Sequence, residues 1–136
     1  MNAFTIGKVA RATGVSVETI RFYERRGLIA QPNRPKDGSA RDYDVETVAR
    51  LRFIRHAKDI GFSLAEVAEL LALRDDRSAG CATVRAQAIS KRRDIKDKLE
   101  KLKGMRDLLD DLIAACPGEG HLSECTILEA MESDRG

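Results

Sequence analysis

Residues 81–125 read CATVRAQAISKRRDIKDKLEKLKGMRDLLDDLIAACPGEGHLSEC, and they contain all three cysteines of the chain. Residues 82–115 contain no proline and a single glycine, and apolar residues recur there every seven positions, with others three or four positions away. This spacing predicts one long helix with an apolar seam along one side. The seam residues are Ala88, Ile95, Leu99, Leu102, Met105, Leu109, Leu112 and Ile113.

Three cysteines, Cys81, Cys116 and Cys125, stand at the two ends of this stretch. Cys81 and Cys116 are 35 positions apart (116 − 81). In a helix that separation spans roughly 50 Å, because each residue adds about 1.5 Å. Two thiols so far apart cannot bind one ion within one chain. If two copies pair antiparallel along the seam, the Cys81 end of one helix lies beside the Cys116 end of the other. The pattern therefore predicts a homodimer with two equivalent three-thiol sites.

Length and composition favour a small domain joined to an extended helix. The chain has 136 residues, of which 4% are aromatic and 34% charged, with no Trp. Such material is poorly suited to a large buried core, and no catalytic triad, paired carboxylates or phosphate-binding glycine loop is apparent, so we do not expect an enzyme. There is no signal-like or membrane-spanning apolar run. We expect a cytoplasmic protein with reduced thiols and no membrane partner.

The formal net charge of +2 hides two halves of opposite sign. Residues 1–60 hold 12 Lys+Arg against 7 Asp+Glu, a net of +5 (12 − 7). Residues 61–136 hold 12 against 15, a net of −3 (12 − 15). Nine of the 12 basic residues in the first half are arginines, whose forked guanidinium suits phosphates and guanine edges. The first half is therefore the half expected to face an anionic partner.

The first half begins with two short helical patterns. Thr5 can cap a helix over residues 6–12. After a Thr-Gly-Val turn, Ser16 can cap a second helix over residues 17–26. This arrangement predicts a helix-turn-helix whose second helix is short enough to enter a major groove, with an ordinary helical hairpin as the alternative. The basic, proline-containing residues 30–43 predict a β-wing or a solvated loop.

Further helices are predicted before and after the long one in the sequence. Asp44 can cap a third helix, and residues 63–66 form a capping box that opens a fourth. Residues 74–80 are polar and predict a hinge before the long helix. Beyond that helix, the Pro- and Gly-containing loop 116–125 lets its two cysteines return toward each other. Residues 126–131 predict a last helical turn or two.

Several segments together resemble the MerR family of bacterial transcription regulators along nearly the whole chain. They are TIGKVA (5–10), GVSVETIRFYERRGL (14–28), RDY (41–43), RFIRHA (52–57) and GFSL (61–64). The resemblance implies a dimer on promoter DNA whose two promoter elements are spaced too far apart. Effector binding then twists and bends the DNA until RNA polymerase engages both elements. One departure is Ala40, which stands where the family usually has an aromatic or apolar residue before the wing.

The predicted fold class is therefore mainly α, in four parts. These are a winged helix-turn-helix for DNA binding (1–43), connector helices and a hinge (44–80), a coiled-coil dimerisation helix (81–115), and a metal-binding loop and tail (116–136).

The effector class follows from the thiols and the short tail. Family members that sense organic molecules carry a large extra domain after the coil, and the redox-sensing members carry four closely spaced cysteines. Copper(I)-sensing members resemble this loop but have serine where this chain has Cys81. A third thiolate supplies charge for a soft divalent ion. The spacings resemble those of mercury-sensing members, so Hg(II) is favoured.

Other divalent metals stay open. Zn(II) prefers four ligands, and His121 is a candidate fourth ligand beside the three cysteines. Zinc-sensing members resemble this chain in having a loop histidine, but they typically carry a second cysteine where this chain has Pro117. Similar spacings also occur in lead-sensing members, so Pb(II) and Cd(II) remain candidates.

DNA contact is expected on or beside the recognition helix, in the wing, and at one phosphate-neighbouring lysine. The residues are Thr19, Arg21, Tyr23, Arg26, Arg41, Tyr43 and Lys58. Two other classes remain as alternatives: a metal-buffering protein, and a thiol redox switch in which Cys116 and Cys125 form a disulfide.

Overall fold

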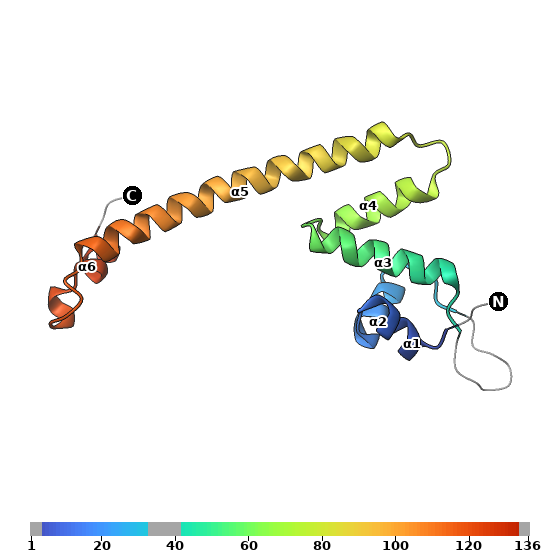
Figure 1. The fold of residues 1–136 in the computed structure, drawn as a ribbon, viewed down its shortest axis with the longest axis horizontal. Coiled ribbons are helices and arrows are strands. Elements are labelled where there is room, and N and C mark those ends of the chain that lie inside the picture. Colours follow the sequence, from blue (N-terminus) through green and yellow to red (C-terminus); the bar gives the residue numbers. More distant parts are fainter. Residues whose placement is uncertain (1–3, 33–41, 134–136) are drawn as a thin grey trace. The chain divides into compact units, whose positions relative to one another are not determined.

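The computed structural model describes residues 4–32 and 42–133, and every structural statement below refers to these residues. The chain divides into two compact units, Met1–Lys91 and Arg92–Gly136. The first holds α1 (Ile6–Thr13), α2 (Val17–Arg25), α3 (Val45–Asp59), α4 (Leu64–Asp75) and the first turns of α5 (Cys81–Ala115). The second holds the rest of α5, the 3-10 helix η1 (Leu122–Glu124) and α6 (Thr126–Glu132) (Figure 1). The prediction of a mainly α chain is confirmed.

Helices α1 and α2 form the predicted helix-turn-helix. Thr5 caps α1 by accepting a hydrogen bond from the Lys8 N–H, and Ser16 caps α2 by accepting one from Thr19. Gly14 ends α1 with φ of 72°, a left-handed conformation that side-chain-bearing residues rarely adopt. The Thr13 hydroxyl donates to the Val9 carbonyl at 2.8 Å and accepts from the Val15 N–H at 3.3 Å, which ties the turn to the end of α1.

One hydrophobic core joins α1, α2, α3 and α4. Its fully buried members come from every one of these helices, which explains why the helical patterns have one apolar face each. The largest are Val9, Ile20, Leu51, Ile54, Val67 and Leu71. The core therefore holds α1 against both the recognition helix α2 and α3, and α3 against α4.

Caps set the starts of α3 and α4 as predicted. The Asp44 carboxylate accepts a 2.8 Å hydrogen bond from the Thr47 N–H, and that bond lowers the pKa of Asp44. Ser63 and Glu66 form both bonds of the capping box. Helix α4 runs through Asp75, so the non-helical link to α5 is 76–80, shorter than the predicted hinge of 74–80.

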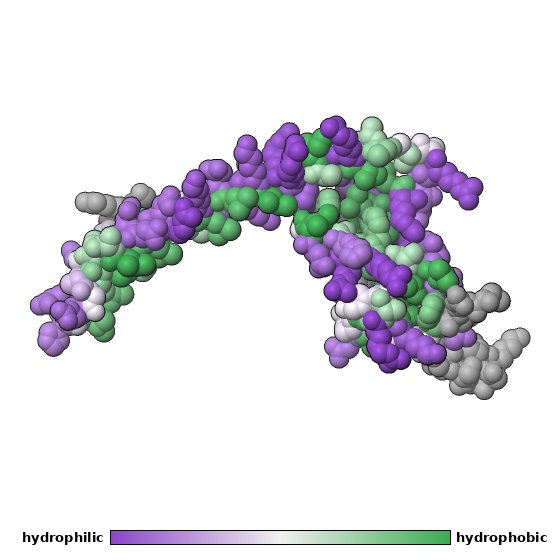
Figure 2. Space-filling model, in the orientation of Figure 1, coloured by the Kyte–Doolittle hydropathy of each residue, from purple (hydrophilic) through white to green (hydrophobic). Residues whose placement is uncertain are grey.

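Helix α5 spans the predicted residues 81–115 without interruption. Within the single chain no residue of α5 is buried, and most of the large apolar seam residues are exposed. Figure 2 shows these apolar side chains gathered along one face of the helix. They include Ile95, Leu99, Leu102, Met105, Leu109 and Ile113. An exposed apolar stripe of this length marks an interaction surface.

The predicted wing falls mostly on residues 33–41, which lie outside the described residues. On its C-terminal side, Tyr43 forms an isolated antiparallel bridge with Phe4, with N–H to carbonyl distances of 2.9 and 2.7 Å. No helix in the described part of the chain is long and apolar enough to cross a membrane.

Candidate metal centre and DNA-reading surface

Two thiols meet in the loop after α5. Cys116 directly follows the helix, and Gly118 and Gly120, with φ of 79° and 110°, turn the chain back. The Gly118 N–H donates to the Cys116 sulfur at 3.4 Å. Cys125 directly precedes α6, and both thiols are half-buried. The loop therefore brings Cys116 and Cys125 together from positions nine residues apart (125 − 116).

The pKa of the Cys125 thiol is lowered. The main cause is the backbone N–H of Leu128, followed by that of Ile127, and the Cys116 thiol adds a smaller contribution. Backbone donors stabilise a thiolate, which is the form that binds metal ions. The local structure therefore favours the thiolate form of Cys125, with the Cys116 sulfur nearby.

Cys81 lies at the other end of α5. It is the first residue of the helix and its side chain is exposed. Helix α5 has 35 residues, so roughly 50 Å of helix separates it from Cys116. Within residues 4–32 and 42–133 of a single chain, no three His, Cys, Asp or Glu side chains are grouped closely enough to hold a metal ion.

His121 is exposed and stands immediately before η1. Its side chain forms no capping hydrogen bond with that helix. The imidazole lies in the same loop as Cys116 and Cys125.

The predicted DNA-contacting residues fall into a surface group and a buried group. Arg21 and Arg26 on or just after α2 are exposed, as is Lys58 in the last turn of α3. The Arg26 guanidinium lies 5.7 Å from the centre of the Phe22 ring, a cation–π contact that orients it. Thr19 is half-buried, and its hydroxyl oxygen accepts a 2.8 Å hydrogen bond from Ser16. Arg41 lies outside the described residues.

Tyr23 and Tyr43 belong to the buried group. Their exposures are 6% and 3%, and both pack in the core. Burial raises the pKa of Tyr23. The Tyr43 hydroxyl donates to the Glu24 carboxylate of α2, so Tyr43 links the chain beyond the predicted wing to the recognition helix. The two tyrosines therefore belong to the core that supports α2, and not to the exposed surface that carries Arg21 and Arg26.

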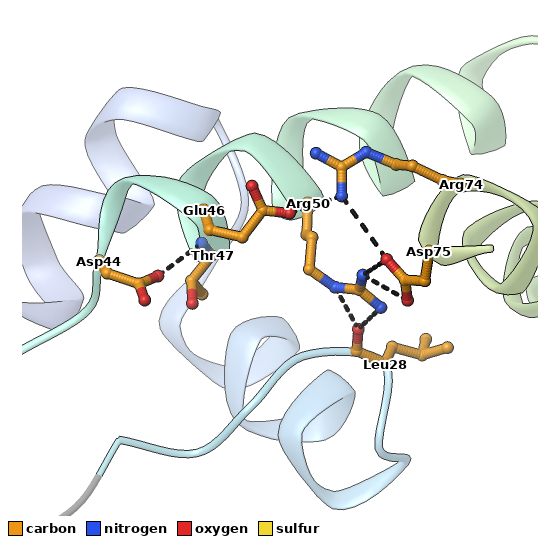
Figure 3. Close-up of polar contacts among 7 residues, drawn as sticks. All are labelled: Leu28, Asp44, Glu46, Thr47, Arg50, Arg74 and Asp75. Carbon is orange, nitrogen blue, oxygen red and sulfur yellow. Dashed lines mark hydrogen bonds and ion pairs between the residues drawn. The ribbon is translucent and has the colours of Figure 1, made fainter. Parts of the chain in front are cut away.

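Arg50 and its neighbours were not singled out by the sequence reasoning. Figure 3 shows the Arg50 side chain of α3 pointing toward Asp75 at the end of α4 and the Leu28 carbonyl after α2. Its Nη1 atom lies 2.7 and 2.9 Å from the Asp75 oxygens, and Nε and Nη2 lie 3.1 and 2.9 Å from the Leu28 oxygen. Arg74 pairs with Glu46 at 2.6 Å. The sequence contains these oppositely charged residues. Because the partners are 25 and 28 positions apart, nothing in the sequence indicates that they form ion pairs.

Arg55 is a second residue of this kind. Its guanidinium donates to the Thr13 carbonyl at 2.8 Å and so caps the end of α1 from α3. It lies against Gly14, where a Cβ atom would overlap it. The turn of the helix-turn-helix is therefore held by a side chain 42 positions away.

The fold and these surfaces define a class: a helix-turn-helix DNA-binding regulator with an exposed apolar helix beyond its core. A sequence model described as "MerR HTH family regulatory protein" matches residues 4–73, and one described as "MerR, DNA binding" matches residues 48–112. The chain belongs to the MerR family of transcription regulators, and the predicted resemblance is confirmed.

Relatives cover nearly the whole chain. It is 39% identical over 132 residues to a mercuric resistance operon regulatory protein of Shigella flexneri, covering 97% of this chain and 90% of the relative. It is 41% identical over 128 residues to a protein of the same description from Bacillus cereus, covering 94% of this chain and 96% of the relative.

Two solved structures are similar in fold as well as in sequence. One is the transcription regulator PbrR691 from Ralstonia metallidurans CH34 in complex with lead(II), with a TM-score of 0.82, 33% identity, and coverage of 94% of this chain and 98% of that chain. The other is MerR from Bacillus megaterium MB1 in complex with mercury(II) ion, with a TM-score of 0.73, 35% identity, and coverage of 96% and 100%.

Proposed function

We propose that this chain is a metal-responsive transcription regulator that acts as an antiparallel homodimer on double-stranded promoter DNA. Cys81 of one protomer joins Cys116 and Cys125 of the other around one soft divalent ion. The observation that carries this proposal is the placement of the thiols around α5: Cys81 is its first residue, Cys116 directly follows its last, and Cys125 lies in the loop beyond. Two antiparallel copies turn these separated ends into two equivalent sites.

The exposed seam supplies the force for pairing. Large apolar side chains such as Leu99, Leu102 and Ile113 are each more than half exposed in the single chain. Each such side chain stabilises by about 1.5–3 kcal/mol when fully buried. A seam along most of α5 therefore favours association with a second copy of the same helix.

The thiols favour a soft divalent ion. Three thiolates give the site a net negative charge around a +2 ion, and soft sulfur ligands select soft metals. Hg(II) is the favoured effector, supported by the description of the relatives as mercuric resistance regulators and by the mercury-bound and lead-bound similar structures. Zn(II), with His121 as fourth ligand, and Pb(II) or Cd(II) are the alternatives.

DNA is read by the exposed basic residues of α2 and its surroundings. Arg21 and Arg26 face the groove, Lys58 contacts a phosphate, and Arg41 extends the contact from the wing. Thr19 adds a polar contact, and Tyr23 and Tyr43 hold the recognition helix in place. Metal binding at the coil end re-angles the two DNA-binding units through residues 76–80, and the distorted promoter becomes readable by RNA polymerase in the cytoplasm.

Promoter activation in vitro tests the proposal directly. The assay compares Hg(II), Zn(II), Cd(II), Pb(II) and Cu(I) on the wild-type protein with RNA polymerase and the promoter it occupies. Cys→Ser changes at positions 81, 116 and 125 should each abolish metal-dependent activation while DNA binding persists. A Cys81→Ser protein that still responds fully to the divalent metal would show that the site is not shared.

A thiol redox switch is the second candidate, because the Cys116 thiol lies close enough to Cys125 to contribute to its lowered pKa. It predicts activation by an oxidant in the absence of metal. Under this alternative, Cys81→Ser would leave the response intact, whereas the metal proposal requires its loss.

A further inference from the structure

A side-chain clamp ties the first turns of α5 to α4. The Lys91 ammonium lies 2.8 Å from the Glu66 carboxylate and 5.6 Å from the centre of the Phe62 ring. Lys91 is ten positions after Cys81 (91 − 81) and is the last residue of the first compact unit. We call Lys91, Glu66 and Phe62 the α4–α5 clamp.

The clamp is more sheltered than an ordinary surface ion pair. The Lys91 side chain is 11% exposed and that of Glu66 is 36% exposed. Phe62 is buried in the core that carries the recognition helix. A lysine whose ammonium lies over an aromatic ring and pairs with a carboxylate loses much of its conformational freedom. The clamp therefore has one preferred geometry.

Backbone packing between α4 and α5 is sparse compared with that of α3 against α1 and α4. The link 76–80 is non-helical, and its internal bonds, from Ser78 to the Asp76 carboxylate, are local. Within the first unit, the clamp is therefore a side-chain contact between α4 and the beginning of α5.

We propose that the α4–α5 clamp determines which half-site spacing the dimer accepts on DNA. A dimer reads two half-sites at a separation set by the geometry that joins its two recognition helices. Each protomer contributes one clamp, so both lobes are fixed by the same contact. This inference rests on the proposed function, in which the chain binds DNA as a dimer.

Glu66 and Lys91 allow clean substitutions. Glu66→Gln removes the charge that faces Lys91 but retains a side chain that serves in a capping box. Lys91→Met retains an unbranched side chain and removes the ammonium that faces Glu66 and Phe62, and Lys91→Arg retains the charge. Lys96→Met is the matched control, because Lys96 is an exposed lysine of the same helix.

The experiment starts from duplexes that the wild-type protein selects from a random-sequence library. Affinity is measured for a selected duplex with two half-sites and for the same duplex with one base pair inserted between them. The spacing penalty is the ratio of the two Kd values. We expect Glu66→Gln and Lys91→Met to reduce this penalty by roughly threefold to tenfold, since two moderately sheltered ion pairs are lost per dimer. Lys91→Arg and Lys96→Met should keep the wild-type penalty.

Each outcome has a distinct meaning. If both charge-removing variants keep the full penalty, or lose affinity equally for both duplexes, the clamp has no role in spacing and the inference is overturned. If the wild-type protein selects no paired half-sites, the proposed function fails and the inference falls with it. Far-UV circular dichroism on every variant confirms that the helices remain folded.

Discussion

Replacing Arg50 should cost more stability than replacing its acidic partner. Arg50 joins three elements, because it bonds the Asp75 carboxylate of α4 and the Leu28 carbonyl after α2 from a position on α3. Its side chain is 18% exposed, whereas that of Asp75 is 53% exposed. The two halves of the interaction therefore lie in different environments.

The magnitudes follow from that difference. The half-exposed ion pair with Asp75 contributes about 0.5 kcal/mol after solvent screening. The bonds from a charged guanidinium to the Leu28 carbonyl contribute about 1.5 kcal/mol. Asp75→Asn, whose amide oxygen still accepts a bond, should cost about 0.5 kcal/mol. Arg50→Met should cost about 2 kcal/mol, because it also deprives the Leu28 carbonyl of its donors.

Urea unfolding at one fixed protein concentration measures both changes, and a double-mutant cycle separates the pair from the carbonyl contact. The concentration is held constant because unfolding of a dimer depends on it. Arg52→Met is the matched control, an exposed arginine of the same helix, and should stay within about 0.5 kcal/mol of wild type. Equal losses for Arg50→Met and Asp75→Asn would refute the assignment of most of the energy to Leu28.

Three further predictions follow from the structure. Gly14→Ala should destabilise by about 1–2 kcal/mol, since a residue with a Cβ is strained at φ of 72° and would displace the Arg55 guanidinium; thermal unfolding measures this, and an unchanged midpoint would contradict it. Hydrogen bonding to Lys91, with a smaller contribution from Ser63, lowers the pKa of Glu66 from 4.5 to about 2. Its contribution to stability is present above pH 4.5 and is lost as the pH falls toward 2, so the stability difference between wild type and Glu66→Gln should shrink over that range in urea titrations and should not stay constant. Leu102→Glu places a charge in the seam and should yield monomers by analytical ultracentrifugation, whereas a dimer of wild-type strength would show that the seam is not the interface.

The parts of the fold that depend on local signals were predictable from the sequence. Thr5, Ser16, Asp44 and the Ser63 to Glu66 box each marked a helix start, because capping involves residues only a few positions apart. The seven-residue apolar repeat and the absence of proline over residues 82–115 predicted α5, because both are also properties of neighbouring residues. Local chemistry thus accounts for the helices.

The contacts between helices were not predictable in this way. The Arg50–Asp75 and Arg74–Glu46 pairs and the Arg55 cap on Thr13 join positions far apart in sequence, and exposed charges are common enough that no pairing stands out. Tyr23 illustrates the same point, because its burial depends on how α2 packs on α1 and joins the common core. The convergence of Cys116 and Cys125 was foreseeable, since a short loop with glycines joins them.

Mixed dimers test the shared metal site most directly. One protomer carries Cys81→Ser and the other carries Cys116→Ser with Cys125→Ser, and each has a different affinity tag for purification of the mixed species. Antiparallel sharing leaves one intact three-thiolate site in this dimer, and X-ray absorption with substoichiometric Hg(II) should show three sulfur neighbours. The homodimer of either variant should show at most two. Two sulfur neighbours in the mixed dimer, or three in the Cys81→Ser homodimer, would contradict a site built from both protomers.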